Sequence, residues 1–89
     1  MMVPMNFEWD ARKSDKNLLE RGIGFEVAVH ALEHIIESSV DRRQDYGEIR
    51  IIAKCRYDKD ILVVIYTLRG DTCRIISVRK ANKRERKTL

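Results

Sequence analysis

The sequence predicts an α+β fold in which a small antiparallel sheet packs on helices. The first half of the chain has apolar residues at helical spacing, and the second half alternates between apolar and polar residues. A short alternating segment, Met5–Trp9, precedes the helices and predicts one more strand. Helices separated in sequence from the main strands are typical of two-layer domains. The expected order is strand, helix, helix, three strands and a short helix, within a single domain that spans residues 1–89.

A first helix is predicted at Ala11–Arg21. Asp10 is a favourable N-cap residue, and Gly22 is expected to end the helix because glycine readily adopts the left-handed conformation of a C-cap. The apolar face of this helix is narrow, and we expect Leu18 and Leu19 to be its main anchors on the core.

A second helix has a stronger apolar stripe and is expected to end near Ser38–Ser39. The stripe consists of Phe25, Ala28, Val29, Leu32, Ile35 and Ile36. Because these positions recur at helical spacing, they indicate one continuous buried face. The polar segment Asp41–Gly47 that follows predicts a loop.

Three strands are predicted after this loop. Ile49–Arg56 alternates, with Ile49, Ile51, Ala53 and Cys55 on one side and Arg50, Ile52, Lys54 and Arg56 on the other. Ile61–Thr67 is nearly all apolar and β-branched, which predicts a central strand buried on both faces. After a turn around Gly70, Cys73–Arg79 forms the last strand, and Asn82 is a candidate cap for a final basic helix.

The charge of the chain favours an anionic partner. The formal net charge is +4 and the pI is about 9.3, near the basic threshold used for nucleic-acid-binding domains. Basic residues crowd the C-terminal end, at Arg79, Lys80, Lys83, Arg84, Arg86 and Lys87. A solvated basic helix is an equally good account of this cluster on its own.

The sequence predicts a cytoplasmic protein without a membrane segment. No stretch approaches the roughly 20 apolar residues of a membrane span, and no secretory signal is evident. Cys55 and Cys73 are therefore expected to be reduced and buried in strands.

One short motif is similar to a zinc site. His30-Ala31-Leu32-Glu33-His34 matches the H-x-x-E-H pattern, in which two histidines four residues apart share a helix face. No third protein ligand is evident, and the apolar stripe directs His30 and Glu33 away from the buried side. Surface histidines are the better interpretation, and we expect neither a metal nor a cofactor.

Arginine and tyrosine side chains along Tyr66–Lys80 exceed what a hairpin needs for its stability. Arginine presents a fixed, always charged fork that matches phosphate oxygens, and tyrosine can donate a proton or stack on a base. These groups suit metal-independent RNA cleavage, in which the ribose 2′-OH attacks phosphorus, cations offset the developing charge and a donor protonates the leaving oxygen. Arginines that are merely solvated on an open sheet face are the alternative.

Short blocks of residues occur in a fixed order along most of the chain, and they are Phe7-Glu8-Trp9-Asp10, Phe25-Glu26, Gly47-Glu48 with Arg50, Leu62–Thr67, Arg69, Arg74–Ser77, Arg79-Lys80-Ala81 and Arg84-Glu85-Arg86. In these blocks the chain resembles BrnT, the toxin of a bacterial type II toxin–antitoxin pair in the RelE-like ribonuclease group. The resemblance implies a RelE-like sheet packed on helices, RNA cleavage that arrests growth, and a BrnA-like antitoxin that binds operator DNA as a complex with the toxin.

The candidate site residues lie on the three predicted strands and the final helix. Arg50 and Arg79 are expected to hold the scissile phosphate, and Tyr66 is expected to donate a proton or stack on a base. The expected RNA-binding residues are Arg69, Arg74, Lys80 and Arg84.

Structural roles for several of these residues remain open alternatives. Tyr66 is equally interpretable as a core residue with its hydroxyl at the rim. Arg74 is a candidate for an ion pair with Glu48 or Asp71, and Glu48 is a candidate general base or a structural partner of an arginine.

A second hypothesis is a catalytically inactive module that pairs with a DNA-binding, antitoxin-like partner. Cys55 stands where the family commonly has glycine, and the chain ends in Thr88-Leu89 rather than in the usual Tyr-Glu. These departures and the basic C-terminal segment motivate the hypothesis.

Overall fold

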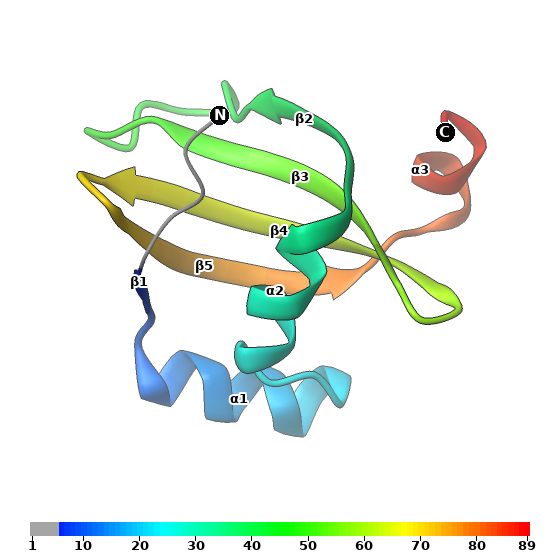
Figure 1. Ribbon diagram of the computed structural model, residues 1–89, viewed down its shortest axis with the longest axis horizontal. Coiled ribbons are helices and arrows are strands. Elements are labelled where there is room, and N and C mark those ends of the chain that lie inside the picture. The colour runs from blue at the N-terminus through cyan, green and yellow to red at the C-terminus, as the bar shows by residue number, and fades with distance from the viewer. Residues whose placement is uncertain (1–5) are drawn as a thin grey trace.

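A computed structural model describes residues 6–89 of the chain (Figure 1). In chain order the elements are β1 (Asn6–Glu8), α1 (Ala11–Arg21), α2 (Glu26–Ala31), the 3-10 turn η1 (Leu32–His34), β2 (Ile35–Val40), β3 (Arg50–Tyr57), β4 (Asp60–Arg69), β5 (Thr72–Lys80) and α3 (Lys83–Lys87). The α+β class is confirmed. Met5, the first residue of the predicted N-terminal strand, lies outside the described residues.

The strands form one five-stranded sheet in the order β1-β5-β4-β3-β2. Strands β2 to β5 pair antiparallel, whereas β1 runs parallel to β5. The sheet is therefore mixed, and the expectation of a purely antiparallel sheet is wrong at this edge. The predicted central position of the third strand is confirmed, because β4 lies in the middle of the order and Leu62, Val63 and Val64 are almost fully buried.

The second helix is much shorter than predicted, and a strand takes the place of its second half. Helix α2 ends at Ala31, and after η1 the segment Ile35–Val40 pairs with β3 as β2. The physical reason is that Ile35, Ile36 and Val40 are β-branched, so they suit a strand as well as a helix, and pairing with β3 satisfies their backbone groups. Every residue of β2 is exposed, so the stripe predicted to be buried does not extend beyond η1.

Helix α1 has the predicted bounds, with Asp10 accepting bonds from the first turn and Gly22 at φ 73° ending the helix. Its predicted anchors are wrong, because Leu18 is 52% and Leu19 is 89% exposed. The buried side of α1 is polar instead. Asn17 Nδ2 donates to the carbonyl oxygens of Ile23 (2.7 Å) and Val78 (3.0 Å), which fixes the helix to β5.

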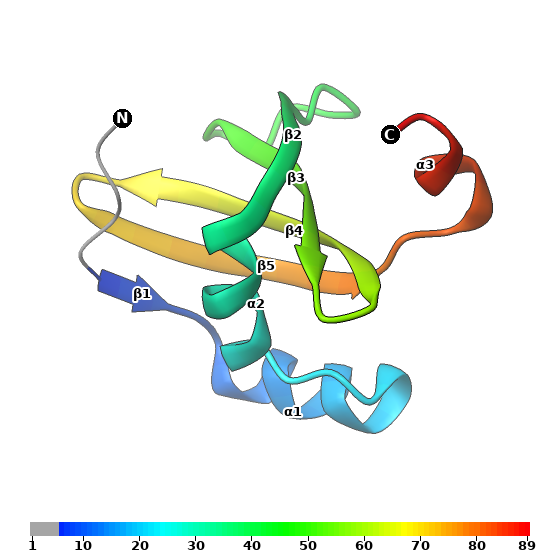
Figure 2. The same cartoon turned by 45° about the vertical axis from the view of Figure 1, so that its right-hand side comes forward.

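Helices α1 and α2 cover one face of the sheet, and the core lies between this face and the two helices (Figures 1 and 2). It is formed by Ile23, Phe25, Ala28, Ala31, Ala53, Cys55, Leu62, Val64, Cys73, Ile75 and Val78. Both predicted cysteine positions are confirmed, since Cys55 and Cys73 are buried and free. Burial raises the pKa of each thiol to about 11. Within residues 6–89, no helix has the length and apolar character needed to cross a membrane.

The opposite face of the sheet carries most of the basic side chains that the strands contribute, and we call it the arginine face. Strand alternation and pairing place on it Arg50, Ile52 and Lys54 of β3, Val63, Ile65, Thr67 and Arg69 of β4, and Arg74, Ser77 and Arg79 of β5. The short helix α3 lies at one end of the sheet, away from α1 and α2 (Figure 1).

Candidate nucleic-acid interface

A β-bulge in β5 brings two of the predicted arginines onto the same face. Arg74 and Arg79 are five residues apart, so in a regular strand they would point to opposite faces. The register shifts between Tyr66, which pairs with Ile75, and Ile65, which pairs with Ser77, so one extra residue is inserted in β5. As a result, Arg74 and Arg79 pair with Thr67 and Val63, which lie on the same side of β4.

Three arginines and two glutamates form the first cluster on the arginine face. Glu48 lies 3.6 Å from Arg50 Nε and 3.2 Å from Arg69, and Glu8 lies 3.7 Å from Arg69 and 3.4 Å from Arg74. Arg74 therefore pairs with Glu8 and not with Glu48 or Asp71. Each carboxylate of this cluster is shared between two neighbouring arginines. No arginine therefore has a carboxylate that binds it alone.

Arg50 is the least exposed arginine of the first cluster. Its side chain is 26% exposed, and its buried Nε has no hydrogen-bond partner among the described residues. The guanidinium stacks on the Tyr46 ring at 4.1 Å from the centroid. A buried donor without a partner is uncommon in folded proteins, and the nearby Glu48 carboxylate, 3.6 Å away, is too distant for a hydrogen bond.

The loop between β2 and β3 holds Tyr46 in place. The buried carboxylate of Asp41 accepts two hydrogen bonds from the Arg43 side chain, at 2.8 and 2.7 Å, and one from the Tyr46 hydroxyl at 2.9 Å. The hydrogen bond from Arg43 is the main reason that the pKa of Asp41 lies well below its usual range. This network fixes the aromatic ring against Arg50.

A second cluster consists of Arg79, Lys54, Glu85 and Glu37. Arg79 donates two parallel bonds to the Glu85 carboxylate, at 2.7 and 2.8 Å, and Lys54 Nζ lies 2.9 Å from Glu37. The hydrogen bonds with Glu85 raise the pKa of Arg79, and the same bonds lower the pKa of Glu85 to about 2. Both clusters are therefore balanced by carboxylates in the free protein.

The two clusters lie in separate rows across the sheet. Arg50, Thr67 and Arg74 form one row of paired residues, and Lys54, Val63 and Arg79 form another. Because four residues of β3 and β4 separate the rows, their backbones are about 13 Å apart along the strands. Because Arg50 and Arg79 also lie two strands apart, they suit two different phosphates better than a single phosphate.

Tyr66 does not lie with Arg50 and Arg79. It pairs with Ile51 and Ile75 and packs against the core on the face covered by α1 and α2. Burial is the main reason that the pKa of its hydroxyl is raised. The structure does not bring Tyr66 together with the two arginines, and the core interpretation fits its position.

The two remaining basic residues predicted to bind RNA lie outside the clusters. Lys80 follows Arg79 directly, is exposed, and lies 3.8 Å from Asp60 at the end of the sheet. Arg84 is exposed on α3. The presence of α3, with Asn82 as its N-cap residue, confirms the predicted final helix. In the sequence, both residues are close to Arg79 and Glu85 of the second cluster.

The zinc-like motif is interrupted by the end of α2. His30 lies in the helix, whereas His34 is the last residue of η1, so the two histidines do not share an α-helical face. Within residues 6–89, no three histidine, cysteine, aspartate or glutamate side chains are grouped closely enough to hold a metal ion.

A comparison with protein families identifies the chain. The matching family model is described as the ribonuclease toxin BrnT of a type II toxin–antitoxin system, and it matches residues 9–85. The chain belongs to the BrnT family. A search of curated proteins found no match. All five cations of the two clusters, Arg50, Lys54, Arg69, Arg74 and Arg79, lie within the matched region.

The sequence does not assign a role to five residues of the two clusters and their surroundings, which are Glu8, Glu37, Tyr46, Lys54 and Glu85. The alternation of β3 predicts the correct side for Lys54, which it shares with Arg50. Glu85 lies three residues after Asn82, the spacing of a capping box, and this signal could have located its carboxylate near the end of β5. No sequence signal separates Tyr46 from an ordinary loop residue.

Proposed function

We propose that this BrnT-family toxin is a metal-independent endoribonuclease that binds single-stranded RNA across the arginine face. The observation that carries the proposal is the sharing of Glu8 and Glu48 among Arg50, Arg69 and Arg74. Guanidinium groups held by shared carboxylates keep donors that a phosphate can use. The family match supports the same substrate class.

The scissile phosphate is proposed to bind at Arg50. Attack of the 2′-OH on phosphorus places additional negative charge on the phosphate oxygens, and a preorganised cation stabilises that charge most effectively where water is largely excluded. Arg50 meets this requirement, because Tyr46 covers it and its Nε–H has no partner among the described residues. Arg79 holds a neighbouring phosphate of the same strand.

Two groups beside Arg50 are able to transfer protons. The Glu48 carboxylate lies 3.6 Å from Arg50 Nε and is placed to accept the proton of the attacking 2′-OH. The Tyr46 hydroxyl donates to Asp41 at 2.9 Å in the free protein, so we propose that it protonates the leaving 5′-oxygen only after it exchanges Asp41 for that oxygen. The proposal assigns no chemical step to Tyr66, which lies on the other face of the sheet.

We further propose the biological setting that follows from a toxin of this type. RNA cleavage inhibits translation and arrests growth in the cytoplasm, and a BrnA-like antitoxin neutralises the toxin. The complex of the two proteins contacts operator DNA. The net charge of +4 supports association with an acidic partner and with nucleic acid.

The direct test is cleavage of a generic RNA by purified protein in excess EDTA. Arg50→Ala is expected to lower the cleavage rate by about a hundredfold or more, the usual effect of removing a group that stabilises developing charge. Arg12→Ala is the matched control, because Arg12 is exposed on α1 at a distance from the arginine face. Equal cleavage by wild type and Arg50→Ala would remove Arg50 from the site.

The alternative is a binding module without activity, and it is motivated by the buried Cys55, which stands where the family commonly has glycine. Expression in a bacterium separates the two functions. A ribonuclease toxin arrests growth and is rescued by the product of the neighbouring small gene, whereas an inactive module does neither. RNA that stays intact with wild-type protein in several buffers would favour the module.

A further inference from the structure

The Arg79–Glu85 pair has the geometry of an arginine that holds a phosphate. Both terminal nitrogens of Arg79 donate to the two carboxylate oxygens of Glu85, at 2.7 and 2.8 Å. Two parallel bonds of this kind are how arginine binds carboxylate and phosphate alike. The Glu85 oxygens therefore stand in for two oxygens of a phosphodiester.

Lys54 points to the same place from the other side of β4. Its Nζ contacts Glu37 at 2.9 Å, the Glu85 carbonyl oxygen at 3.2 Å and Thr88 Oγ1 at 2.8 Å. Lys54 and Arg79 flank Val63 in one row of the sheet, so their backbones are about 10 Å apart. The Lys54 side chain is only 16% exposed, because Glu37 and the C-terminal residues Glu85 and Thr88 surround its ammonium group.

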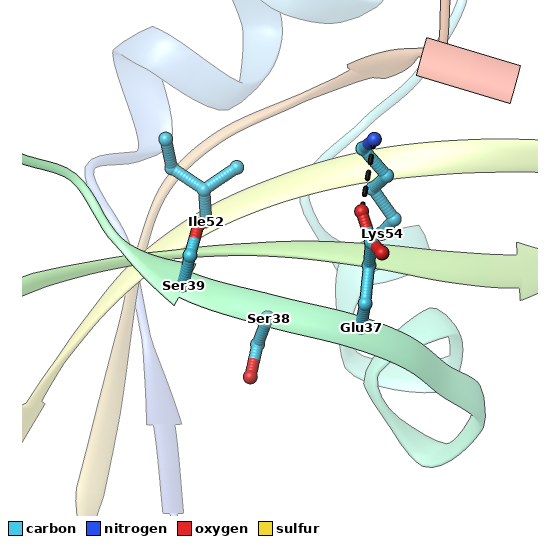
Figure 3. A pocket seen from close by; sticks show the side chains of 5 residues that line it. All are labelled: Glu37, Ser38, Ser39, Ile52 and Lys54. Carbon is cyan, nitrogen blue, oxygen red and sulfur yellow. Dashed lines mark ion pairs between the residues drawn. The ribbon is translucent and has the colours of Figure 1, made fainter. Parts of the chain in front are cut away.

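A pocket opens beside Lys54 between β2 and β3 (Figure 3). It has a volume of about 210 Å³ and is lined by Glu37, Ser38, Ser39, Ile52 and Lys54. Ser39 and Ile52 lie on the same side of the strands as Lys54, whereas Ser38 points the opposite way (Figure 3). The volume is below the range of pockets for drug-sized ligands, and it suits one sugar or one base next to a phosphate.

We propose that Arg79 and Lys54 form a subsite for a phosphodiester of single-stranded RNA, and that Glu85 fills this subsite in the free protein. The inference rests on the proposed function, since it names where a phosphate next to the scissile one binds. RNA and the Glu85 carboxylate then compete for Arg79, while Lys54 Nζ, which pairs with Glu37 in the free protein, adds a second cation at the same subsite. Displacement is feasible because α3 has five residues, none of them buried, and so short a helix has little stability of its own.

Glu85→Gln separates the competing charge from the structure of α3. Glutamine also satisfies a capping box, so the substitution removes the anion while the bond to the Asn82 backbone is kept. The measurement is the Kd of a single-stranded RNA with 2′-O-methyl groups throughout, which cannot be cleaved through the 2′-OH. We expect Glu85→Gln to bind this RNA about tenfold more tightly, which corresponds to about 1.4 kcal/mol.

Two controls distinguish competition from a general change of charge. Glu33→Gln changes the net charge equally at an exposed residue of η1, and we expect its Kd to stay within about twofold of wild type. Arg79→Ala and Lys54→Gln, each introduced into the Glu85→Gln protein, are expected to remove the gain. A thermal melt of each variant shows whether it is folded.

Each outcome supports or overturns the proposal, independently of cleavage. If Glu85→Gln weakens binding as much as Arg79→Ala does, Glu85 positions the arginine and the competition is refuted. An unchanged Kd, or a gain that Arg79→Ala leaves intact, refutes it as well. If wild type cleaves no RNA, the proposed function fails, whereas tighter binding by Glu85→Gln still supports the subsite.

Discussion

Asn17 is predicted to contribute more to stability than either leucine that follows it in α1. Its amide donates to the carbonyl oxygens of Ile23 and Val78, which belong to residues that are 8% and 0% exposed. Asn17→Ala removes the amide, so both buried carbonyl oxygens lose this hydrogen bond. Each buried acceptor that loses its partner costs about 1–3 kcal/mol, so we expect a total loss of about 2–6 kcal/mol for the two acceptors. That is a large share of the roughly 5–15 kcal/mol that stabilises a typical domain.

Urea unfolding followed by circular dichroism measures this loss. The midpoint should fall while the dependence on urea concentration stays unchanged, which shows that the native state itself is destabilised. Leu19→Ala is the matched control in the same helix, and because Leu19 is 89% exposed, its effect should stay within about 0.5 kcal/mol. If Asn17→Ala also stays within this limit, the two hydrogen bonds do not hold α1 to the sheet.

Two further predictions concern the faces of the sheet. Tyr66→Phe should keep the RNA cleavage rate within about threefold of wild type, because the hydroxyl lies on the helix-covered face; a loss comparable to that of Arg50→Ala would contradict this. The pKa of Glu85 is lowered from 4.5 to about 2, so its pairing with Arg79 contributes stability in full above about pH 4.5 and loses it as the pH falls toward 2. The NMR amide shift of Glu85 should therefore stay constant from pH 7 to about pH 4, and a change centred near pH 4.5 would contradict the pairing.

The sequence predicts strand faces well because side chains alternate strictly along a strand. The sides assigned to β3, with Ala53 and Cys55 inward and Arg50 and Lys54 outward, are those of the structure. The same rule fails in β5, where alternation alone would separate Arg74 from Arg79. The bulge that reunites them has no signal in the residues around Ile76, because bulges depend on pairing with a neighbouring strand.

The errors in the first half of the chain have a different origin. The apolar residues at Ile35 and Ile36 continue a helical spacing, but their β-branched side chains and the exposed edge of β3 favour a strand. Local periodicity cannot report a pairing partner that is distant in the chain. In α1, the leucines suggested an apolar contact, whereas the buried face is formed by Ser14 and Asn17, whose hydrogen bonds depend on the backbone of the following loop and of β5.

The carboxylates on the arginine face reconcile two requirements of an RNA-binding sheet. Five cations on neighbouring strands repel one another, and Glu8, Glu37, Glu48 and Glu85 offset that repulsion while the protein is free. Because these side chains are partly exposed and a phosphate takes the place of the displaced carboxylate, the exchange replaces one charge-assisted pair with another and leaves no cation unpaired. Fully buried pairs would resist the exchange, since breaking one leaves an uncompensated charge. Partial exposure thus lets the same residues stabilise the free sheet and release their cations to RNA.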